Sequence, residues 1–155
     1  NIEISNLDEI GIDGFYEFYV LTNKQYGLSN LSKDFFIELF NSAKNIKFDI
    51  LIAKYKSQIL GFVVLVSDKT YSIYWLGARL EEAPNIGYFD LLQWEMIKTA
   101  KSLGCKYYDL CYLEKDRLPS IYKFKSDYSN EKYNILNINY KPFIYRIINK
   151  FQKIF

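Results

Sequence analysis

Apolar and polar positions change their spacing along this chain, and each change marks a type of secondary structure. Between residues 12 and 43 the large apolar side chains recur every three or four positions, the period of an amphipathic helix. Between residues 48 and 78 they form β-branched and aromatic runs broken by short polar turns, a pattern typical of a β-meander. We therefore expect helices at residues 12–26 and 33–43, then antiparallel strands at residues 48–55, 58–66 and 70–78.

The ends of these elements are also marked. Gly27 follows the first apolar stripe and is expected to end that helix, because glycine readily adopts the left-handed conformation found there. Ser32 is expected to cap the second helix, whose inward residues would include Phe36. The strand at residues 58–66 is nearly all apolar, which predicts a central position in the sheet. Residues 1–11 are polar and uneven and are expected to be the end of a linker.

The stretch from residue 74 to residue 112 organises the rest. It contains a strand end, a loop, a helix expected at residues 87–103 and a strand expected at residues 106–111. Asn85 is the expected N-cap of this helix, and Gly104 stands where a left-handed residue would end it. A strand–helix–strand unit of this length implies a crossover connection and a parallel pair of strands. The helical face is marked by Leu92, Met96, Ala100 and Leu103.

Further elements are expected at residues 118–124 (a short helix), 133–140 (a strand) and 142–154 (a helix). The order predicts an α+β (α/β) fold with a mixed sheet, in which an antiparallel meander precedes the parallel strand–helix–strand unit. A chain of 155 residues without internal repeats fits one domain.

Composition excludes several kinds of site. The chain has no His, which excludes Ser-His-Asp and Cys-His catalysis and any His-based metal site, and we expect no metal. The net charge of +2 does not indicate a nucleic-acid-binding protein. Cys105 and Cys111 flank one expected strand, too far apart for a disulfide, so we expect both to be reduced, as in a cytoplasmic protein.

The N-terminus of the helix at residues 87–103 is a candidate ligand site, because helix N-termini present backbone amides to anions. Substrate contacts are expected from Arg79, Asn85, Ile86 and Gly87. Arg79 would bind a phosphate or carboxylate, or alternatively form a salt bridge with one of the neighbouring residues Glu81 and Glu82.

The order of elements resembles that of the GNAT acyltransferases, which use acyl-CoA. Three segments are more specifically similar to the FemABX peptidyltransferases and the broader FemAB-like acyltransferases. They are residues 91–104, Tyr108-Asp109-Leu110 and residues 121–128. That resemblance implies the second of two GNAT-like domains, with the other upstream of Asn1. The family usually has Gly-Gly after the Asp-bearing strand, where this chain has Cys111-Tyr112.

The resemblance also implies residue roles. Lys125 would stabilise the charge that develops during acyl transfer or hold the terminal phosphate of the carrier. Phe124 would stack on a base or ribose of the tRNA end, with an ordinary place in the core as the alternative. Independently of the resemblance, the position of Asp109 on a strand between apolar residues predicts either a catalytic general base or a structural acceptor for loop amides. Tyr112 would contact substrate.

The expected function is transfer of an aminoacyl or acyl group to an amine of a nucleotide- or lipid-linked cell-wall precursor, in peptidoglycan biosynthesis. The donor would be aminoacyl-tRNA, or acyl-CoA, with no tightly bound cofactor. The alternatives are an acyl-CoA-dependent N-acetyltransferase and a non-catalytic GNAT-like binding module. Residues 142–155 form a basic amphipathic segment that would contact the inner face of the membrane, or else pack on the sheet.

Overall fold

The computed structural model describes residues 1–133 apart from residues 43, 113–114, 117 and 130. The chain divides into two compact units, Asn1–Tyr112 and Leu113–Phe155. The first unit contains a sheet with three helices, and the described part of the second contains α4 (Pro119–Ser126), close to the short helix expected at residues 118–124. The strand expected at residues 133–140 falls, except for its first residue, outside the described part, as does the helix expected at residues 142–154.

The sheet follows the predicted meander. β2 (Lys47–Tyr55), β3 (Gln58–Ser67) and β4 (Tyr71–Arg79) pair antiparallel in sequence order. β4 then pairs with β5 (Tyr107–Asp109) in parallel, which confirms the predicted crossover through α3 (Tyr88–Ser102). The strand order β1-β2-β3-β4-β5 places the apolar β3 at the centre, as its sequence predicted.

The first residues of the chain differ from the prediction. Residues 1–11 are not a linker, because β1 (Ile2–Asn6) pairs antiparallel with β2 and α1 (Leu7–Gln25) begins at once. The Asn6 side chain accepts from the Glu9 amide at 3.3 Å and the Glu9 carboxylate accepts from the Asn6 amide at 3.4 Å, a reciprocal cap that starts the helix. Gly11, at φ 70° and ψ 169°, kinks α1 at the point where the predicted helix was to begin.

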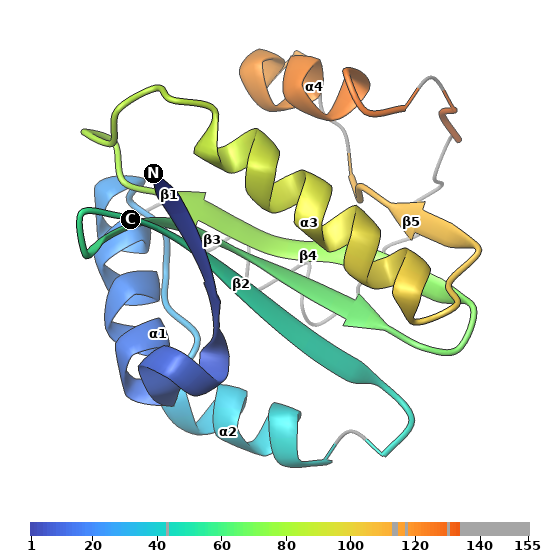
Figure 1. The fold of residues 1–155 in the computed structure, drawn as a ribbon, viewed down its shortest axis with the longest axis horizontal. Helices are drawn as coiled ribbons and strands as arrows, with labels where there is room; N and C mark the ends of the chain where they lie inside the picture. The colour runs from blue at the N-terminus through green and yellow to red at the C-terminus, as the bar shows by residue number, and fades with distance from the viewer. Residues whose placement is uncertain (43, 113–114, 117, 130, 134–155) are drawn as a thin grey trace, which may run out of the picture. The chain divides into compact units, whose positions relative to one another are not determined.

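α1 and α2 (Lys33–Ser42) pack against one face of the sheet through an aromatic cluster (Figure 1). Ser32 caps α2 as predicted, because its hydroxyl accepts from the Phe35 amide at 3.1 Å. Phe36 is fully buried, and its ring lies 5.4 Å from that of Phe15, which in turn lies 5.2 Å from that of Phe62. Edge-to-face aromatic packing therefore joins both helices to β3.

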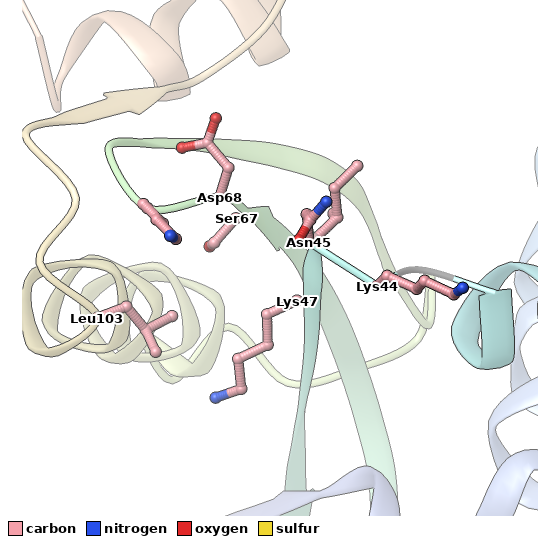
Figure 2. A pocket seen from close by; sticks show the side chains of 8 residues that line it. Lys44, Asn45, Lys47, Ser67, Asp68 and Leu103 are labelled. Carbon is pink, nitrogen blue, oxygen red and sulfur yellow. The ribbon is translucent and has the colours of Figure 1, made fainter.

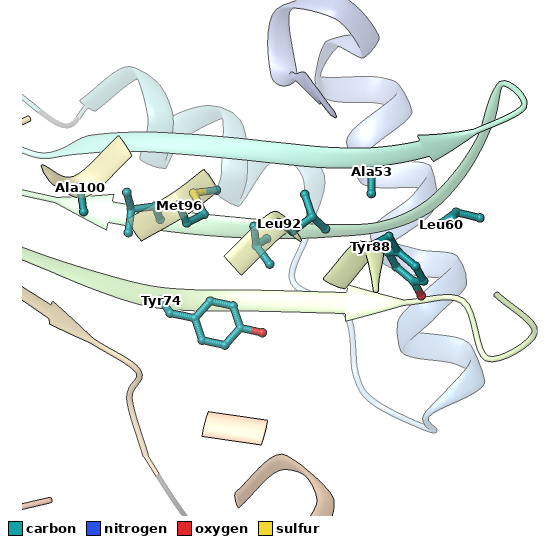
Figure 3. Close-up of a cluster of buried hydrophobic side chains, with 9 residues drawn as sticks. Ala53, Leu60, Tyr74, Tyr88, Leu92, Met96 and Ala100 are labelled. Carbon is teal, nitrogen blue, oxygen red and sulfur yellow. The ribbon is translucent and has the colours of Figure 1, made fainter. Parts of the chain in front are cut away.

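α3 packs on the opposite face through three of the predicted residues, while the fourth, Leu103, is the C-cap and is only partly buried. Leu92, Met96 and Ala100 are buried against β3 and β4 (Figure 3). Gly104 has φ 84° and follows the end of the helix, as expected. β5 covers only residues 107–109 of the expected strand, and Cys105 and Cys111 form no disulfide.

Candidate functional site

Strands β4 and β5 separate shortly after they begin. Their parallel pairing joins Tyr71 to Tyr107 and ends at Ile73 with Asp109, although β4 continues to Arg79. In the part of the chain that the structure describes, no strand pairs with this edge of β4 beyond Ile73. We call the region between residues 74–79 and residues 110–112 the β4–β5 fork. An open strand edge can pair with an extended ligand through its backbone groups.

A bulge in β4 sets the direction of the side chains at the fork. The pairing with β3 steps from Leu65–Tyr74 to Val64–Leu76, so that Trp75 is an extra residue. A bulge bends a strand and changes which face its side chains occupy. Tyr74 consequently lies in the core beneath α3, whereas both Trp75 and Leu76 pack with the cluster beneath α1 and α2.

Asp109 lies at the base of the fork. One carboxylate oxygen accepts from the Tyr71 hydroxyl at 2.6 Å, and the other accepts from the Cys111 amide at 2.6 Å. The second bond holds the turn in which Cys111 adopts a left-handed backbone with φ 61°. These contacts are those of the structural alternative, while a role as general base stays a prediction.

The helix that begins beside the fork is not capped by Asn85, and this expectation was wrong. Gly87 is the N-cap of α3, with φ 75° and ψ 12° and no side-chain hydrogen bond to the helix. Its left-handed backbone turns the chain into the helix, which a residue with a Cβ adopts only with strain. Asn85 and Ile86 lie in the exposed loop that precedes it. The N-cap residue of α3 therefore provides no side-chain acceptor for the backbone amides of the first turn.

The first helical residue lies against the end of β4. Tyr88 is 3% exposed, and its hydroxyl has no hydrogen-bond partner among the described residues. Burial raises the pKa of Tyr88, and the positive charge of Arg79 partly opposes this rise. Gly61 on β3 makes the contact feasible, since a Cβ there would lie 3.1 Å from the Tyr88 ring and 2.9 Å from the Ala78 carbonyl oxygen.

Arg79 ends β4 with an exposed side chain. The alternative that it pairs with Glu81 or Glu82 was wrong, since the ion pairs among the described residues do not include Arg79. Its backbone carbonyl accepts from the Tyr26 hydroxyl at 3.1 Å, which ties the end of α1 to the end of β4. Arg79 is therefore available to an anion at this end of the fork.

The remaining candidates divide between the two units. Tyr112, in the first unit, is 58% exposed. Lys125 and Phe124 lie on α4 in the second unit, where Lys125 is buried and the Phe124 ring lies 5.2 Å from that of Tyr128. A site shared by Lys125 and Asp109 stays a prediction.

Sequence reasoning missed Tyr74, Gly77, Gly61 and Tyr88. A weak signal existed, because a glycine within a strand often marks a close approach of another group. A Cβ on Gly77 would lie 2.9 Å from two carbons of the Tyr74 ring and closer still to the Tyr74 hydroxyl oxygen.

A separate hollow of about 310 Å³ lies at the other end of the sheet, where β2 begins and β3 ends (Figure 2). Lys44, Lys47 and Lys69 line it, but Lys47 binds Asp49 at 2.8 Å, and the Lys44 and Lys47 ammonium groups point away from Ser67. Asp68 accepts from the backbone amides of Thr70 and Tyr71, which lowers its pKa. The lysine ammonium groups around the hollow therefore do not point to a common position where they could bind an anion.

The described residues also lack two other features. No group of three or more Cys, Asp or Glu side chains in the described ranges could hold a metal ion. Within the same ranges, no helix is both long and apolar enough to span a membrane.

Comparisons with known proteins agree with this architecture. Residues 4–126 match the family model of an acetyltransferase (GNAT) domain. No curated protein matches the sequence.

Solved structures with the same fold share few residues with the chain. An aminoglycoside acetyltransferase from an uncultured soil metagenomic sample has a TM-score of 0.70 and 15% identity, over 91% of this chain and 96% of that chain. A possible acetyltransferase from Clostridium difficile 630 has a TM-score of 0.64 and 15% identity, over 91% and 99%. A ribosomal-protein-alanine N-acetyltransferase from Brucella melitensis has a TM-score of 0.59 and 12% identity, over 90% and 100%.

Proposed function

The chain belongs to the acetyltransferase (GNAT) domain family, and on this premise we propose that it transfers an acyl group from acyl-CoA to an amine. The observation that carries the proposal is the β4–β5 fork, where no described strand pairs with the edge of β4 from Tyr74 to Arg79. An extended amide-containing arm, such as that of an acyl-CoA, can pair with such an edge as a strand does.

One end of the fork suits the phosphates of acyl-CoA, and the rest suits its acyl end. Arg79 and the N-terminal amides of α3, which follow Gly87, offer positive charge and hydrogen-bond donors to phosphates. The stretch of β4 between Tyr74 and Gly77, toward the narrow end, would then receive the acyl group. Among the solved structures of this fold are enzymes described as acetylating aminoglycosides and ribosomal-protein alanine, both of which are amines.

Glu81 and Glu82 favour an amine as the acceptor. Both side chains are exposed in the loop that follows β4, and the backbone amide of Glu81 donates to the Gln25 side chain at 3.4 Å. Carboxylates oppose the approach of a phosphate but attract an ammonium group. We therefore propose that ammonium groups of the acceptor remote from its reacting amine contact this loop, while the reacting amine meets the acyl group farther along β4.

A second proposal follows from the motifs shared with FemABX peptidyltransferases. The chain would then use aminoacyl-tRNA as donor and a nucleotide- or lipid-linked peptidoglycan precursor as acceptor. The Glu-bearing, glycine-poor loop before α3 favours this donor over acyl-CoA, because it differs from the glycine-rich phosphate loop of CoA-using relatives. A second GNAT-like domain, a cytoplasmic site at the membrane and membrane contact through residues 142–155 belong to this proposal.

A thermal-shift comparison separates the two proposals. A ligand at a hundred times its dissociation constant should stabilise the protein by about 2.7 kcal/mol. Stabilisation by acetyl-CoA but not by an aminoacylated tRNA acceptor-stem mimic supports the first proposal, and the reverse supports the second. If neither compound binds, the chain is a non-catalytic module and both proposals fail.

The role of Lys125 is tested by Lys125→Ala, with Lys123→Ala as the matched control on the same helix. Lys123 is exposed, so its loss should leave acyl transfer unchanged. If Lys125 stabilises the developing charge, its loss should lower kcat by about 100-fold. Equal rates for the two variants would remove Lys125 from the mechanism.

A further inference from the structure

The Tyr74 side chain reaches along β4 to the middle of the fork. Its ring is 8% exposed and packs beneath α3 with Leu92 and Met96. Figure 3 shows the ring beside β4 on the side away from β3, with the hydroxyl directed toward the end of the strand. The hydroxyl oxygen lies over Gly77, where any Cβ would displace it. A polar group is thus held within the stretch of β4 that β5 leaves open.

The backbone of Tyr74 stands at the start of the stretch that β5 leaves unpaired. Tyr74 is the residue after Ile73, where the pairing with β5 ends. Asp109 holds Cys111 in its left-handed turn. Cys111 lies close enough to the Tyr74 hydroxyl to contribute to its raised pKa. The bulge at Trp75 is what directs Tyr74 into this position.

We infer that the Tyr74 hydroxyl is a catalytic hydrogen-bond donor to the carbonyl oxygen of the acyl group during transfer. This inference rests on the proposed acyl-transfer function. If the donor's phosphates lie beside Arg79, its arm runs along β4 toward Ile73, and its acyl end arrives beside Tyr74 and Gly77. The absence of a Cβ at Gly77 leaves the space that the Tyr74 hydroxyl occupies beside β4.

The step is an ordinary aminolysis of a thioester. The nitrogen of a neutral amine attacks the carbonyl carbon and a C–N bond forms, while the C=O π electrons move onto oxygen. The C–S bond then breaks, the thiolate leaves and is protonated from water, and the nitrogen loses one proton to water. Tyr74 keeps its proton throughout and donates a hydrogen bond to the transient oxyanion, whose charge it stabilises without rearrangement.

The protonation state suits this role. Burial, with a smaller contribution from Cys111, raises the pKa of the Tyr74 hydroxyl far above that of a free tyrosine. The hydroxyl therefore stays a donor at any pH at which the acceptor amine is reactive.

The test is Tyr74→Phe, which keeps the ring and removes only the hydroxyl, with Tyr55→Phe at the end of β2 as the matched control. Initial rates with acetyl-CoA and an acceptor amine found by screening give kcat and the KM for acetyl-CoA. We expect kcat to fall about 100-fold in Tyr74→Phe, with KM changed less than threefold. Tyr55→Phe should match the wild type.

Gly77→Ala gives an independent test, because its Cβ should push the Tyr74 hydroxyl away. It should lower kcat strongly in the wild type and less in Tyr74→Phe, where the new Cβ still meets two ring carbons but the hydroxyl is already gone. A Tyr74→Phe enzyme with kcat within threefold of wild type would overturn the inference while leaving the proposed function intact. A wild type that neither binds acetyl-CoA nor acylates any amine would refute the proposed function itself.

Discussion

The contact between β3 and the start of α3 can be probed with a single methyl group. Gly61 lies on β3 opposite Arg79, and a Cβ there would lie 2.9 Å from the Ala78 carbonyl oxygen and 3.1 Å from a carbon of the Tyr88 ring. Neither neighbour can move easily, because one is strand backbone and the other is a buried ring. Gly61→Ala should therefore displace the end of β4 or the first turn of α3.

The expected cost follows from overpacking. Inserting a methyl group into a well-packed core costs about 1–3 kcal/mol. For a chain of this length, 1 kcal/mol lowers Tm by about 2–4 °C, so Gly61→Ala should lower it by roughly 2–12 °C. The same displacement should weaken acetyl-CoA binding, because the amides after Gly87 would move.

Gly14→Ala is the matched control. Gly14 lies in α1, and its new Cβ would make an ordinary 3.5 Å contact with Ile10. Both substitutions restrict the unfolded chain equally, so the difference between them reports the folded state. Gly14→Ala should stabilise the protein by about 0.5–1 kcal/mol.

Urea denaturation followed by circular dichroism measures both variants, and calorimetry measures binding of acetyl-CoA. If Gly61→Ala is as stable as Gly14→Ala, the close packing of Gly61 against Tyr88 and Ala78 is wrong. Unchanged acetyl-CoA affinity in a destabilised Gly61→Ala would show that the start of α3 does not bind the donor.

The remaining predictions concern Tyr74, Gly87 and Asn6. Because the pKa of Tyr74 is raised in the folded state, only the unfolded state loses this proton just above pH 10. The free energy of unfolding should therefore be independent of this group below about pH 10 and fall by up to about 1.4 kcal/mol per pH unit above it. Urea melts of Tyr74→Phe should show a shallower fall, and equal slopes would contradict the burial of the hydroxyl. Gly87→Ala meets no atom within 4 Å but must keep φ 75°, so it should cost about 1 kcal/mol, measured by Tm, and no cost would exclude the left-handed cap. Asn6→Ala should cost about 1 kcal/mol in urea melts through loss of the cap of α1, and an unchanged midpoint would mean that the cap does not stabilise the helix.

Most elements of the fold could be predicted because their signals are local. The stripe of Leu92, Met96 and Ala100 and the apolar run of β3 reflect burial that a short window of sequence records. β1 was missed because Ile2 and Ile4 give only two apolar alternations, and the strand is stabilised by pairing with β2 far along the chain.

The site was less predictable because it depends on register. The position of Tyr74 over Gly77 depends on the bulge at Trp75, which exists only relative to β3. The cap of α3 was misassigned because the sequence rule favours a side-chain acceptor such as Asn85, whereas the backbone of Gly87 makes the turn. Arg79 was correctly placed at a strand end, whereas Asp109 ends β5 although that strand was expected to continue to residue 111, and the role of Lys125 stays a prediction.

The two tryptophans of the chain, Trp75 and Trp94, report on different surroundings. Trp75 lies among the rings beneath α1 and α2, 6.3 Å from Phe36 and 6.1 Å from Phe48, whereas Trp94 is 55% exposed on α3. Changes in tryptophan fluorescence will consequently report on the face of the sheet that α1 and α2 cover. They will report little about the face that α3 covers. Detachment of α3 alone would leave the emission wavelength almost unchanged, and separation of α1 and α2 would shift it to the red.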